Sequence, residues 1–439
     1  MTTPQPNTPK NDFAFATSRR FAPLFGTQFL GALNDNSFKT TLFVLISFYG
    51  LGKNDTIPSE QMLNVGALLF ILPYFLFSSF SGQLATRYNK ARLAQATKVL
   101  EVAVMAVAGF GFYIQSAPLL LLCLFVMGTQ STLFGPVKYA ILPEYLAEKE
   151  LIMGNGLIES GTFIAILLGQ IIGTAVAGES PLILAGWVVL IAILGLGASA
   201  AMPSVAPKEP ELKVNWNIAR GTQSLIAQTY KQPELFTAIM GISWFWFIGA
   251  VYTTQLPTFV RIHLHGNTAV FNLMLTLFSI SIASGSITCA KLSKGDLKLW
   301  LVTLGATGLT VCGSALVFVL YGTQFSGSLN DLQGAGAFLS QGMAYPVILL
   351  MVGIGFFGGF FSVPLYTWLQ TASSDEFRAN AIAVNNILNA VFMVAAALMS
   401  IVLLTLFNSI LLLYLVVALG NIGFLYYLGK RAPQLFKRS

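Results

Sequence analysis

Twelve apolar stretches follow one another along the chain, separated by shorter polar segments. A helix that spans the hydrocarbon core of a bilayer needs roughly 20 apolar residues. The pattern therefore predicts an all-α membrane protein with twelve transmembrane helices, near residues 22–50, 62–84, 93–115, 118–140, 153–178, 181–202, 234–260, 268–290, 299–321, 342–367, 379–407 and 409–428.

One long polar segment, 203–233, interrupts this pattern in the middle of the chain. It begins with prolines and charges, and over 214–231 it alternates apolar residues such as Trp216 and Leu225 with polar ones. Such alternation is typical of an amphipathic helix at a membrane surface. We therefore predict a tail over 1–20, a six-helix bundle over 21–202, a linker with an amphipathic helix over 203–233, a second six-helix bundle over 234–429 and a tail over 430–439.

Two polar segments are expected to lack a fixed structure. Residues 1–20 carry three prolines and no apolar core, so we expect a disordered tail. Loop 322–341 is rich in Gly, Ser, Asn and Gln, and we expect it to be flexible.

The composition agrees with a membrane protein and excludes two other classes. Only 9% of the residues are charged, against about 25% in soluble domains. This scarcity excludes a soluble enzyme and a nucleic-acid-binding protein. The three cysteines and two histidines have no spacing typical of a disulfide framework or a metal site. No Gly-x-x-x-x-Gly-Lys-[Ser/Thr] stretch is present, so we expect no ATP site, no cofactor and no catalytic residue.

The basic residues indicate an orientation. All but three of the 24 lysines and arginines fall on one side if both termini are cytoplasmic, the exceptions being Lys39, Lys53 and Arg261. Cytoplasmic loops of membrane proteins carry an excess of Lys and Arg. We therefore expect a multi-pass protein with both termini in the cytoplasm.

Weak internal similarity relates the two predicted bundles. Phe134-Gly-Pro-Val-Lys-Tyr is followed by Asn155, and Phe361-Ser-Val-Pro-Leu-Tyr is followed by Asn380 and Asn385. Duplicated bundles of this kind hold their site at the interface between the repeats, near the midplane.

Ionisable residues at membrane depth are expensive and usually functional. They are Asp35, Lys39, Glu101, Lys138 and Glu159, all in the first half, whereas the second half offers amides such as Asn385, Asn386 and Asn389. Asp35 and Lys39 are spaced i, i+4 and can pair on one helix face. The two charges either only neutralise each other or serve in gating, ion coupling or contact with a headgroup. We expect Lys138 and Glu159 to pair as a cytoplasmic gate, and Lys98 to pair with Glu101.

Two further patterns concern close packing of helices. Gly169-x-x-x-Gly173 allows a helix to approach its neighbour. The segment from Gly82 through Arg87, Lys90 and Arg92 resembles the loop motif of the major facilitator superfamily, although Thr86 stands at the position of the usual acid. The alternative is a loop that only carries positive-inside charge.

The first helix, Arg20-Phe-Ala-Pro-Leu-Phe-Gly-Thr-Gln-Phe-Leu-Gly-Ala-Leu-Asn-Asp-Asn36, resembles that of the bacterial lysophospholipid transporter family of this superfamily. The segments around Lys138, Glu159, Pro364 and Asn380 are also similar, so the resemblance covers nearly all of 19–428. It is closest to the transporter domain that some bacteria fuse to an acyltransferase and acyl-carrier-protein synthetase, enzyme domains not expected in this chain.

The resemblance implies a major facilitator fold in the bacterial inner membrane. It also implies movement of lysophospholipids, chiefly lysophosphatidylethanolamine, from the outer to the inner leaflet without ATP. The implied partners are the lysophospholipid, membrane lipids and a separate acyltransferase, and the chain is expected to be a monomer. Asp35, Lys39, Lys138, Glu159, Asn155, Asn380 and Asn385 are the expected headgroup or gating residues. Thr253-Thr254-Gln255 departs from an Arg found in some relatives.

Two alternatives remain from the residues alone. A proton-coupled exporter of amphipathic drugs or metabolites could use Asp35 and Glu159 as protonation sites. A non-transporting membrane scaffold could dock an acyltransferase through 214–231 and the C-terminal tail.

Overall fold

The computed structural model describes residues 13–52, 59–323, 325–326 and 328–436, and most of them are helical. Within this part of the chain, twelve helices of 20 to 31 residues form the body of the protein. They are α1 (Ala22–Phe48), α2 (Ser59–Arg87), α3 (Lys90–Tyr113), α4 (Ala117–Ala140), α6 (Glu148–Val176), α7 (Pro181–Ala200), α9 (Pro233–His263), α10 (Thr268–Ser293), α11 (Trp300–Tyr321), α13 (Ala344–Ala372), α14 (Arg378–Phe407) and α15 (Ile410–Arg431). The prediction of an all-α protein with twelve long helices is confirmed.

Eleven of these twelve helices are long and apolar enough to cross a membrane, counted over the described residues. The twelfth, α1, is equally long, but Asn34, Asp35, Asn36 and Lys39 lower the hydropathy of its middle. Several helices extend beyond the apolar stretches that predicted them, and α6 begins at Glu148 rather than near 153. Charged residues continue a helix past the membrane surface, so hydropathy alone places its ends poorly.

The long helices form two bundles of six. The N-bundle contains α1–α4, α6 and α7, and the C-bundle contains α9–α11 and α13–α15. Within each bundle the strongest packing joins α1 to α6, α2 to α4, α3 to α7, α10 to α13 and α11 to α13. The bundles contact each other through α6 with α10 and α13, and through α14 with α2 and α4.

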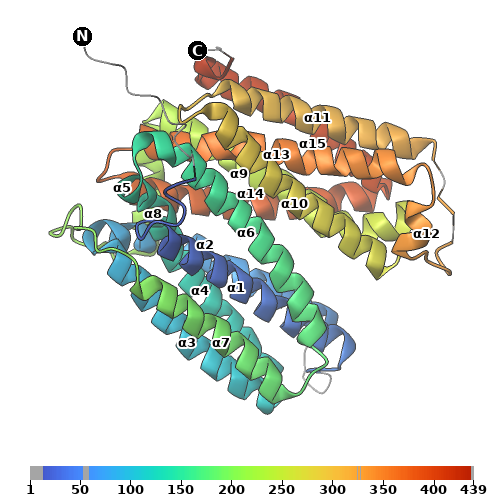
Figure 1. The fold of residues 1–439 in the computed structure, drawn as a ribbon, viewed down its shortest axis with the longest axis horizontal. Coiled ribbons are helices and arrows are strands. Elements are labelled where there is room, and N and C mark those ends of the chain that lie inside the picture. The colour runs from blue at the N-terminus through green and yellow to red at the C-terminus, as the bar shows by residue number, and fades with distance from the viewer. Residues whose placement is uncertain (1–12, 53–58, 324, 327, 437–439) are drawn as a thin grey trace, which may run out of the picture.

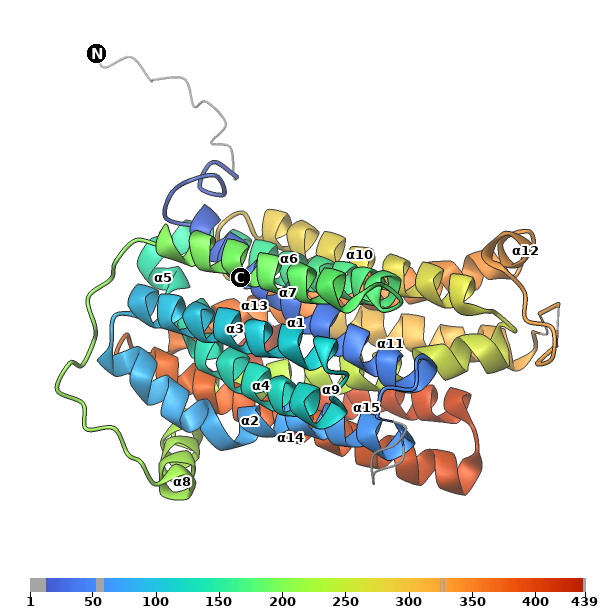
Figure 2. The same ribbon diagram turned by 90° about the horizontal axis from the view of Figure 1, so that it is seen from below.

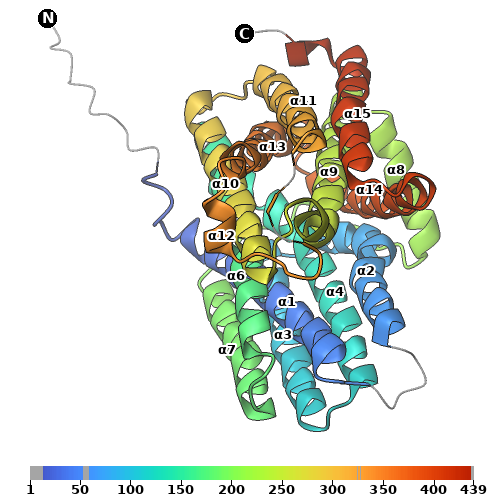
Figure 3. The same cartoon turned by 90° about the vertical axis from the view of Figure 1, so that its right-hand side faces the viewer.

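Figure 1 shows the bundles in contact at the end where both described termini lie, and diverging toward the opposite end. We call these the terminal end and the open end. Figure 3, which looks toward the open end, shows the N-bundle and C-bundle as two separate groups of helices.

Glycines bring α1 and α6 together, as the Gly169-x-x-x-Gly173 pattern predicts. A Cβ atom at Gly169 would lie 2.7 Å from the Leu33 carbonyl oxygen, and one at Gly173 would lie 2.5 Å from the Ser37 carbonyl oxygen. Only glycine permits this approach, which fixes the segment of α1 that carries Asp35 against the N-bundle.

The linker contains α8 (Ile218–Tyr230), an amphipathic helix capped by Asn217. Its Gly221, Leu225 and Thr229 are buried, and it packs against α2, α9 and α14. Figure 2 shows α8 at the terminal end, beside α2. A shorter helix, α5 (Leu142–Tyr145), lies between α4 and α6.

Two segments expected to lack a fixed structure have one over their described residues. Over residues 13–20 the chain forms turns, Phe15 packs on Phe21 at 5.0 Å, and Arg20 pairs with Glu150 at 2.6 Å. The rest of the predicted tail, 1–12, lies outside the described residues, as do Lys53 and 437–439.

Loop 322–341, expected to be flexible, also has defined structure at its described residues, which exclude 324 and 327. It contains α12 (Ala335–Leu339), and Gln333 forms three hydrogen bonds with the turn after α9: its backbone N–H donates to His265, its side chain donates to the Leu264 carbonyl, and its carbonyl accepts from Asn267. A polar residue such as Gln333, which suggests flexibility in a sequence, here forms hydrogen bonds with backbone groups of the neighbouring turn.

Candidate functional site

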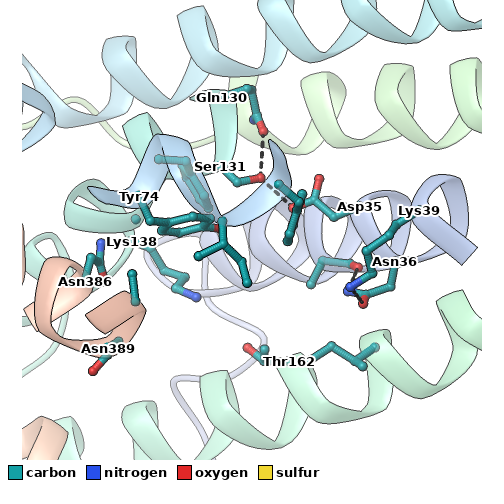
Figure 4. Close-up of a pocket in the computed structure, with 18 of the residues that line it drawn as sticks. Asp35, Asn36, Lys39, Tyr74, Gln130, Ser131, Lys138, Thr162, Asn386 and Asn389 are labelled. Carbon is teal, nitrogen blue, oxygen red and sulfur yellow. Dashed lines mark hydrogen bonds between the residues drawn. The ribbon is translucent and has the colours of Figure 1, made fainter. Parts of the chain in front are cut away.

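A cavity of about 430 Å³ lies between the two bundles and is the candidate functional site. Helices α1, α2, α4 and α6 supply most of its wall, and α9, α13, α14 and Lys98 of α3 supply the rest. Figure 4 shows its polar residues, which include Asp35, Lys39 and Lys138 from the predicted set. The aromatic and aliphatic part of the wall includes Phe43, Phe70, Ile71, Ile166 and Met393.

Asp35 is nearly buried in the wall of this cavity. The Ser131 hydroxyl of α4 donates a hydrogen bond of 2.5 Å to Asp35 Oδ2. The other carboxylate oxygen, Oδ1, has no hydrogen-bond partner among the described residues. Asp35 therefore lines the cavity with a carboxyl group whose Oδ1 is buried and unpaired within the described residues.

Asp35 and Lys39 both line the cavity, but the ion pair that their i, i+4 spacing allows is not formed. The Lys39 amine donates to Asn36 Oδ1 at 3.2 Å and lies 5.0 Å from the centre of the Phe70 ring. Asp35 turns to α4 instead. The i, i+4 spacing allows a pair, but nearer polar and aromatic partners on α1, α2 and α4 decide where the side chains lie.

Lys138 extends its amine into the cavity, as Figure 4 shows. Its nitrogen lies 4.6 Å from the centre of the Tyr139 ring, and no ion pair within the described part of the chain holds it. The predicted gate pair with Glu159 is wrong in this structure. Glu159 is buried at the contact between bundles, where it accepts a hydrogen bond from Ser362 of α13.

A buried polar cluster lies behind Asp35. Lys98 Nζ is 2.6 Å from Glu101 Oε2, which confirms the predicted i, i+3 pair. Asn34 and Gln130 also donate to the Glu101 carboxylate, at 2.9 and 3.2 Å. All four side chains are almost fully buried. Glu101 thus has three donors, whereas Asp35 has one.

An aromatic floor separates the cavity from the terminal end. The rings of Tyr139 and Tyr366, from opposite bundles, stack with centroids 4.5 Å apart and planes 9° apart. Trp246 of α9 donates to the Tyr366 hydroxyl at 3.0 Å. This floor joins the two bundles next to the amine of Lys138, which lies over the Tyr139 ring.

The predicted amides Asn155, Asn380 and Asn385 lie outside the cavity lining. Asn155 forms a reciprocal pair with Gln370 of α13, with hydrogen bonds of 2.6 and 3.1 Å. Asn380 packs against Gly82, where a Cβ atom would lie 2.9 Å from Asn380 Oδ1. Asn385 is buried on α14. Asn155 and Asn380 therefore help to close the terminal end.

The basic loop after α2 takes part in an ion-pair network at the terminal end. Lys90 pairs with Glu144 of α5 at 2.8 Å, and both side chains are buried. Arg87 instead lies over the ring of Tyr88 at 5.3 Å. The backbone N–H of Arg92 donates a hydrogen bond to the side chain of Asn89 at the start of α3.

The linker extends this network to the C-bundle. Lys208 Nζ lies 3.1 Å from Asp375 Oδ2 and 4.0 Å from Glu144 Oε1, and Arg378 lies 2.7 Å from Asp375. The backbone N–H groups of Lys208 and Glu209 donate to the carbonyl of Thr86. Hydrogen bonds from Lys208 and Arg378 lower the pKa of Asp375 below its ordinary value.

Sequence reasoning missed several residues of the site. Ser131, Gln130 and Tyr74 line the cavity next to Asp35, and Trp246 and Tyr366 form part of its wall. The adjacent polar pair Gln130-Ser131 inside an apolar stretch was a usable signal. The Lys208–Asp375 contact joins residues 167 positions apart, and no local pattern indicates it.

Comparisons with known proteins place these features in a wider group. The chain is 27% identical over 380 residues to the lysophospholipid transporter LplT of Cronobacter sakazakii, covering 84% of this chain and 85% of that protein. It is 29% identical over 375 residues to lysophospholipid transporter LplT of Escherichia coli strain K12, with 82% of each chain covered. These relatives agree with the resemblance noted from the sequence.

Solved structures share the fold at low sequence identity. The human organic anion transporter MFSD10 (TETRAN) superposes with a TM-score of 0.72 at 13% identity, covering 93% of this chain and 99% of that one. A bacterial homologue of the iron transporter ferroportin, in an outward-facing state, gives 0.66 at 12% identity, covering 92% and 99%. The sequence profile described as Major Facilitator Superfamily matches residues 24–390. The chain belongs to the major facilitator superfamily.

Proposed function

We propose that this protein carries lysophospholipids across the bacterial inner membrane, from the outer to the inner leaflet, by alternating access between its two bundles. The observation that carries the proposal is a cavity between the bundles that combines separated charges of both signs with an apolar wall. The names of the similar transporters give the class of substrate. Lysophosphatidylethanolamine is the member of that class that the charges fit best.

The charges match the headgroup group by group. Lysophosphatidylethanolamine has a phosphate and an ammonium, and neither can leave water without a polar partner. The amines of Lys138 and Lys39 have no carboxylate partner in the described chain and can receive the phosphate. The carboxyl group of Asp35, which lines the same cavity, can receive the ammonium.

The apolar wall suits the single acyl chain. Burial of a chain contributes about 0.8 kcal/mol per CH₂ group. Phe43 and Phe70 line the wall beside the headgroup site, on the side of the open end. A lipid held in this way would have its headgroup near the aromatic floor and its tail toward the open end.

The orientation follows from the basic residues. The terminal end carries Lys90, Lys294, Arg378 and Lys430, whereas Arg261 lies at the other end of α9. By the excess of Lys and Arg in cytoplasmic loops, the terminal end faces the cytoplasm, together with both termini. The structure then represents an outward-open state, ready to receive lipid from the outer leaflet.

Transport of this kind needs neither ATP nor a second copy of the chain. The cavity is completed by the two bundles of one chain, so the monomer is the expected functional unit. The product reaches the inner leaflet, where a separate acyltransferase would restore the second chain.

Transport by purified protein in vesicles tests the proposal. Vesicles with and without the protein receive fluorescent lysophosphatidylethanolamine in the outer leaflet, and dithionite quenches whatever remains outside. We expect protein-dependent protection without ATP, and none for the diacyl lipid with the same headgroup. Equal protection in protein-free vesicles would contradict the proposal. Transport of an amphipathic drug but not of the lysophospholipid would support the exporter.

A further inference from the structure

Ser131 lies between two oxygen atoms that both need a hydrogen. Its Oγ is 2.5 Å from Asp35 Oδ2 and 3.2 Å from Gln130 Oε1, as the dashed lines in Figure 4 show. A serine hydroxyl has one hydrogen to donate and two lone pairs to accept with. It cannot serve both oxygens at once.

The orientation of Gln130 makes this shortage unavoidable. Its amide nitrogen donates to Glu101 Oε2, a carboxylate that also receives Lys98 and Asn34. A flipped amide would place two acceptor oxygens against each other, so the hydrogen-bond network fixes the assignment. Gln130 therefore presents its oxygen to Ser131.

One added proton would give both oxygen atoms a hydrogen-bond donor. If Asp35 is protonated, it donates to Ser131 Oγ, and the serine hydrogen turns to Gln130 Oε1. If Asp35 is ionised, Ser131 must donate to it, and Gln130 Oε1 stays unpaired in a buried site. A buried acceptor without a partner costs about 1–3 kcal/mol.

The surrounding charges do not replace that proton. On α1, the Lys39 amine bonds to Asn36. On α3, Lys98 is paired with Glu101, and on α4, Lys138 lies over Tyr139. On α2, the nearby titratable group is the phenol of Tyr74. Of the other neighbours of α1, α6 directs Glu159 to Ser362, and α7 has no charged residue.

We propose that Asp35 binds a proton when the cavity is empty, and that the cationic headgroup of a lysophospholipid displaces this proton on binding. The carboxylic acid O–H bond breaks, the proton passes to water at the open end, and the carboxylate receives the substrate ammonium. This inference rests on the proposed function for the identity of the displacing cation. It makes substrate and proton competitors for one carboxyl group.

Competition predicts a specific dependence on pH. While Asp35 is protonated in the free protein, affinity for a lipid with an ammonium group rises up to about tenfold per pH unit, because one proton leaves for each lipid bound. At higher pH the affinity becomes constant. Lysophosphatidylglycerol has no cation to displace the proton, so its affinity should not rise with pH.

Infrared difference spectroscopy detects the proton without any substrate. The empty wild-type protein should show the C=O band of a carboxylic acid that shifts in D₂O and is absent from Asp35→Asn. Gln130→Met removes the competing acceptor, so it should weaken the band at the same pH. The matched change Gln95→Met affects a glutamine that donates to the Ser199 carbonyl, and it should leave the band unchanged. An acid band that is equal in wild type and Asp35→Asn would overturn the proposal.

Binding of the two lipids to the wild-type protein, measured across pH in detergent, completes the test. Proton release and a rising affinity for lysophosphatidylethanolamine alone are expected. Tight but pH-independent binding would overturn the proton site and leave the transport function standing. If neither lipid binds, the proposed function fails, while the infrared band still decides whether Asp35 holds a proton.

Discussion

Gly82 of α2 lies in a tight contact with α14 at the terminal end, so an added methyl group there should open that end. A Cβ atom would lie 2.7 Å from Ala383 Cβ, 2.9 Å from Asn380 Oδ1 and 3.1 Å from the Ala379 carbonyl oxygen. Two of these three contacts are with atoms that rotamer changes cannot remove. The helices must therefore separate by a fraction of an ångström in this state.

The expected cost is about 1–3 kcal/mol, the usual range for overpacking a tight contact. Because the contact joins the two bundles, the cost applies to the state that is closed at the terminal end. At 1.4 kcal/mol per factor of ten, Gly82→Ala should shift the equilibrium away from this state by roughly 5- to 150-fold.

Distances between spin labels on the two bundles measure that shift. Tyr113 ends α3 and Tyr321 ends α11, so both lie at the open end, and both are exposed. With Cys123, Cys289 and Cys312 replaced, labels at these positions report the opening. Gly82→Ala should add a population with a shorter distance between the labels.

A matched substitution controls for the effect of alanine itself. Gly186 lies on α7, and a Cβ atom there would meet nothing within 4 Å. Gly186→Ala should therefore leave the distances as in the wild type. If Gly82→Ala and Gly186→Ala give the same distribution, the contact does not hold the terminal end closed.

Three further predictions concern the same closed end. Asp375→Asn should weaken closure by about 1 kcal/mol, because it removes two partly exposed ion pairs; label distances at the open end check this. The pKa of Asp375 is lowered, so its contribution to closure is present above the ordinary pKa of an aspartate, near 3.9, and is lost only as pH falls through the lowered pKa. Between pH 5 and 8, closure should therefore not change through Asp375. A transition in that range that Asp375→Asn abolishes would contradict this prediction. Ser362→Ala should destabilise the closed state by about 1–3 kcal/mol, because it leaves Glu159 without its donor. Glu159→Gln keeps an acceptor for Ser362 and should destabilise that state less. The same label distances compare the two variants.

The fold could be predicted from the sequence because hydropathy is a property of local segments. Each apolar stretch of about 20 residues has one stable solution in a bilayer, a helix with its backbone groups paired internally. The linker helix and the packing of α1 on α6 also have local signals, in the amphipathic stretch and in Gly169 and Gly173. The ends of the helices and the folding of loop 322–341 depend on partners elsewhere in the chain.

The site could be predicted only in part, for the same reason. Charges within apolar stretches identify Asp35, Lys39 and Lys138, which all line the cavity. Their partners are on other helices, and neither Asp35–Lys39 nor Lys138–Glu159 forms an ion pair. The reach of lysine and the rotation of each helix decide between a neighbour at i, i+4 and one on another helix, and spacing along the chain does not contain that information.

The central claim is that Asp35 receives the cationic part of a lysophospholipid headgroup inside the cavity. Transport of lysophosphatidylethanolamine into vesicles by wild type, Asp35→Asn and Asp296→Asn tests it most directly, since Asp296 is an exposed carboxylate at the terminal end. A hydrogen bond to a charged group contributes about 1.5–3 kcal/mol, so Asp35→Asn should lose roughly 10- to 150-fold in transport while the protein stays folded and Asp296→Asn stays active. Undiminished transport by Asp35→Asn would contradict the account.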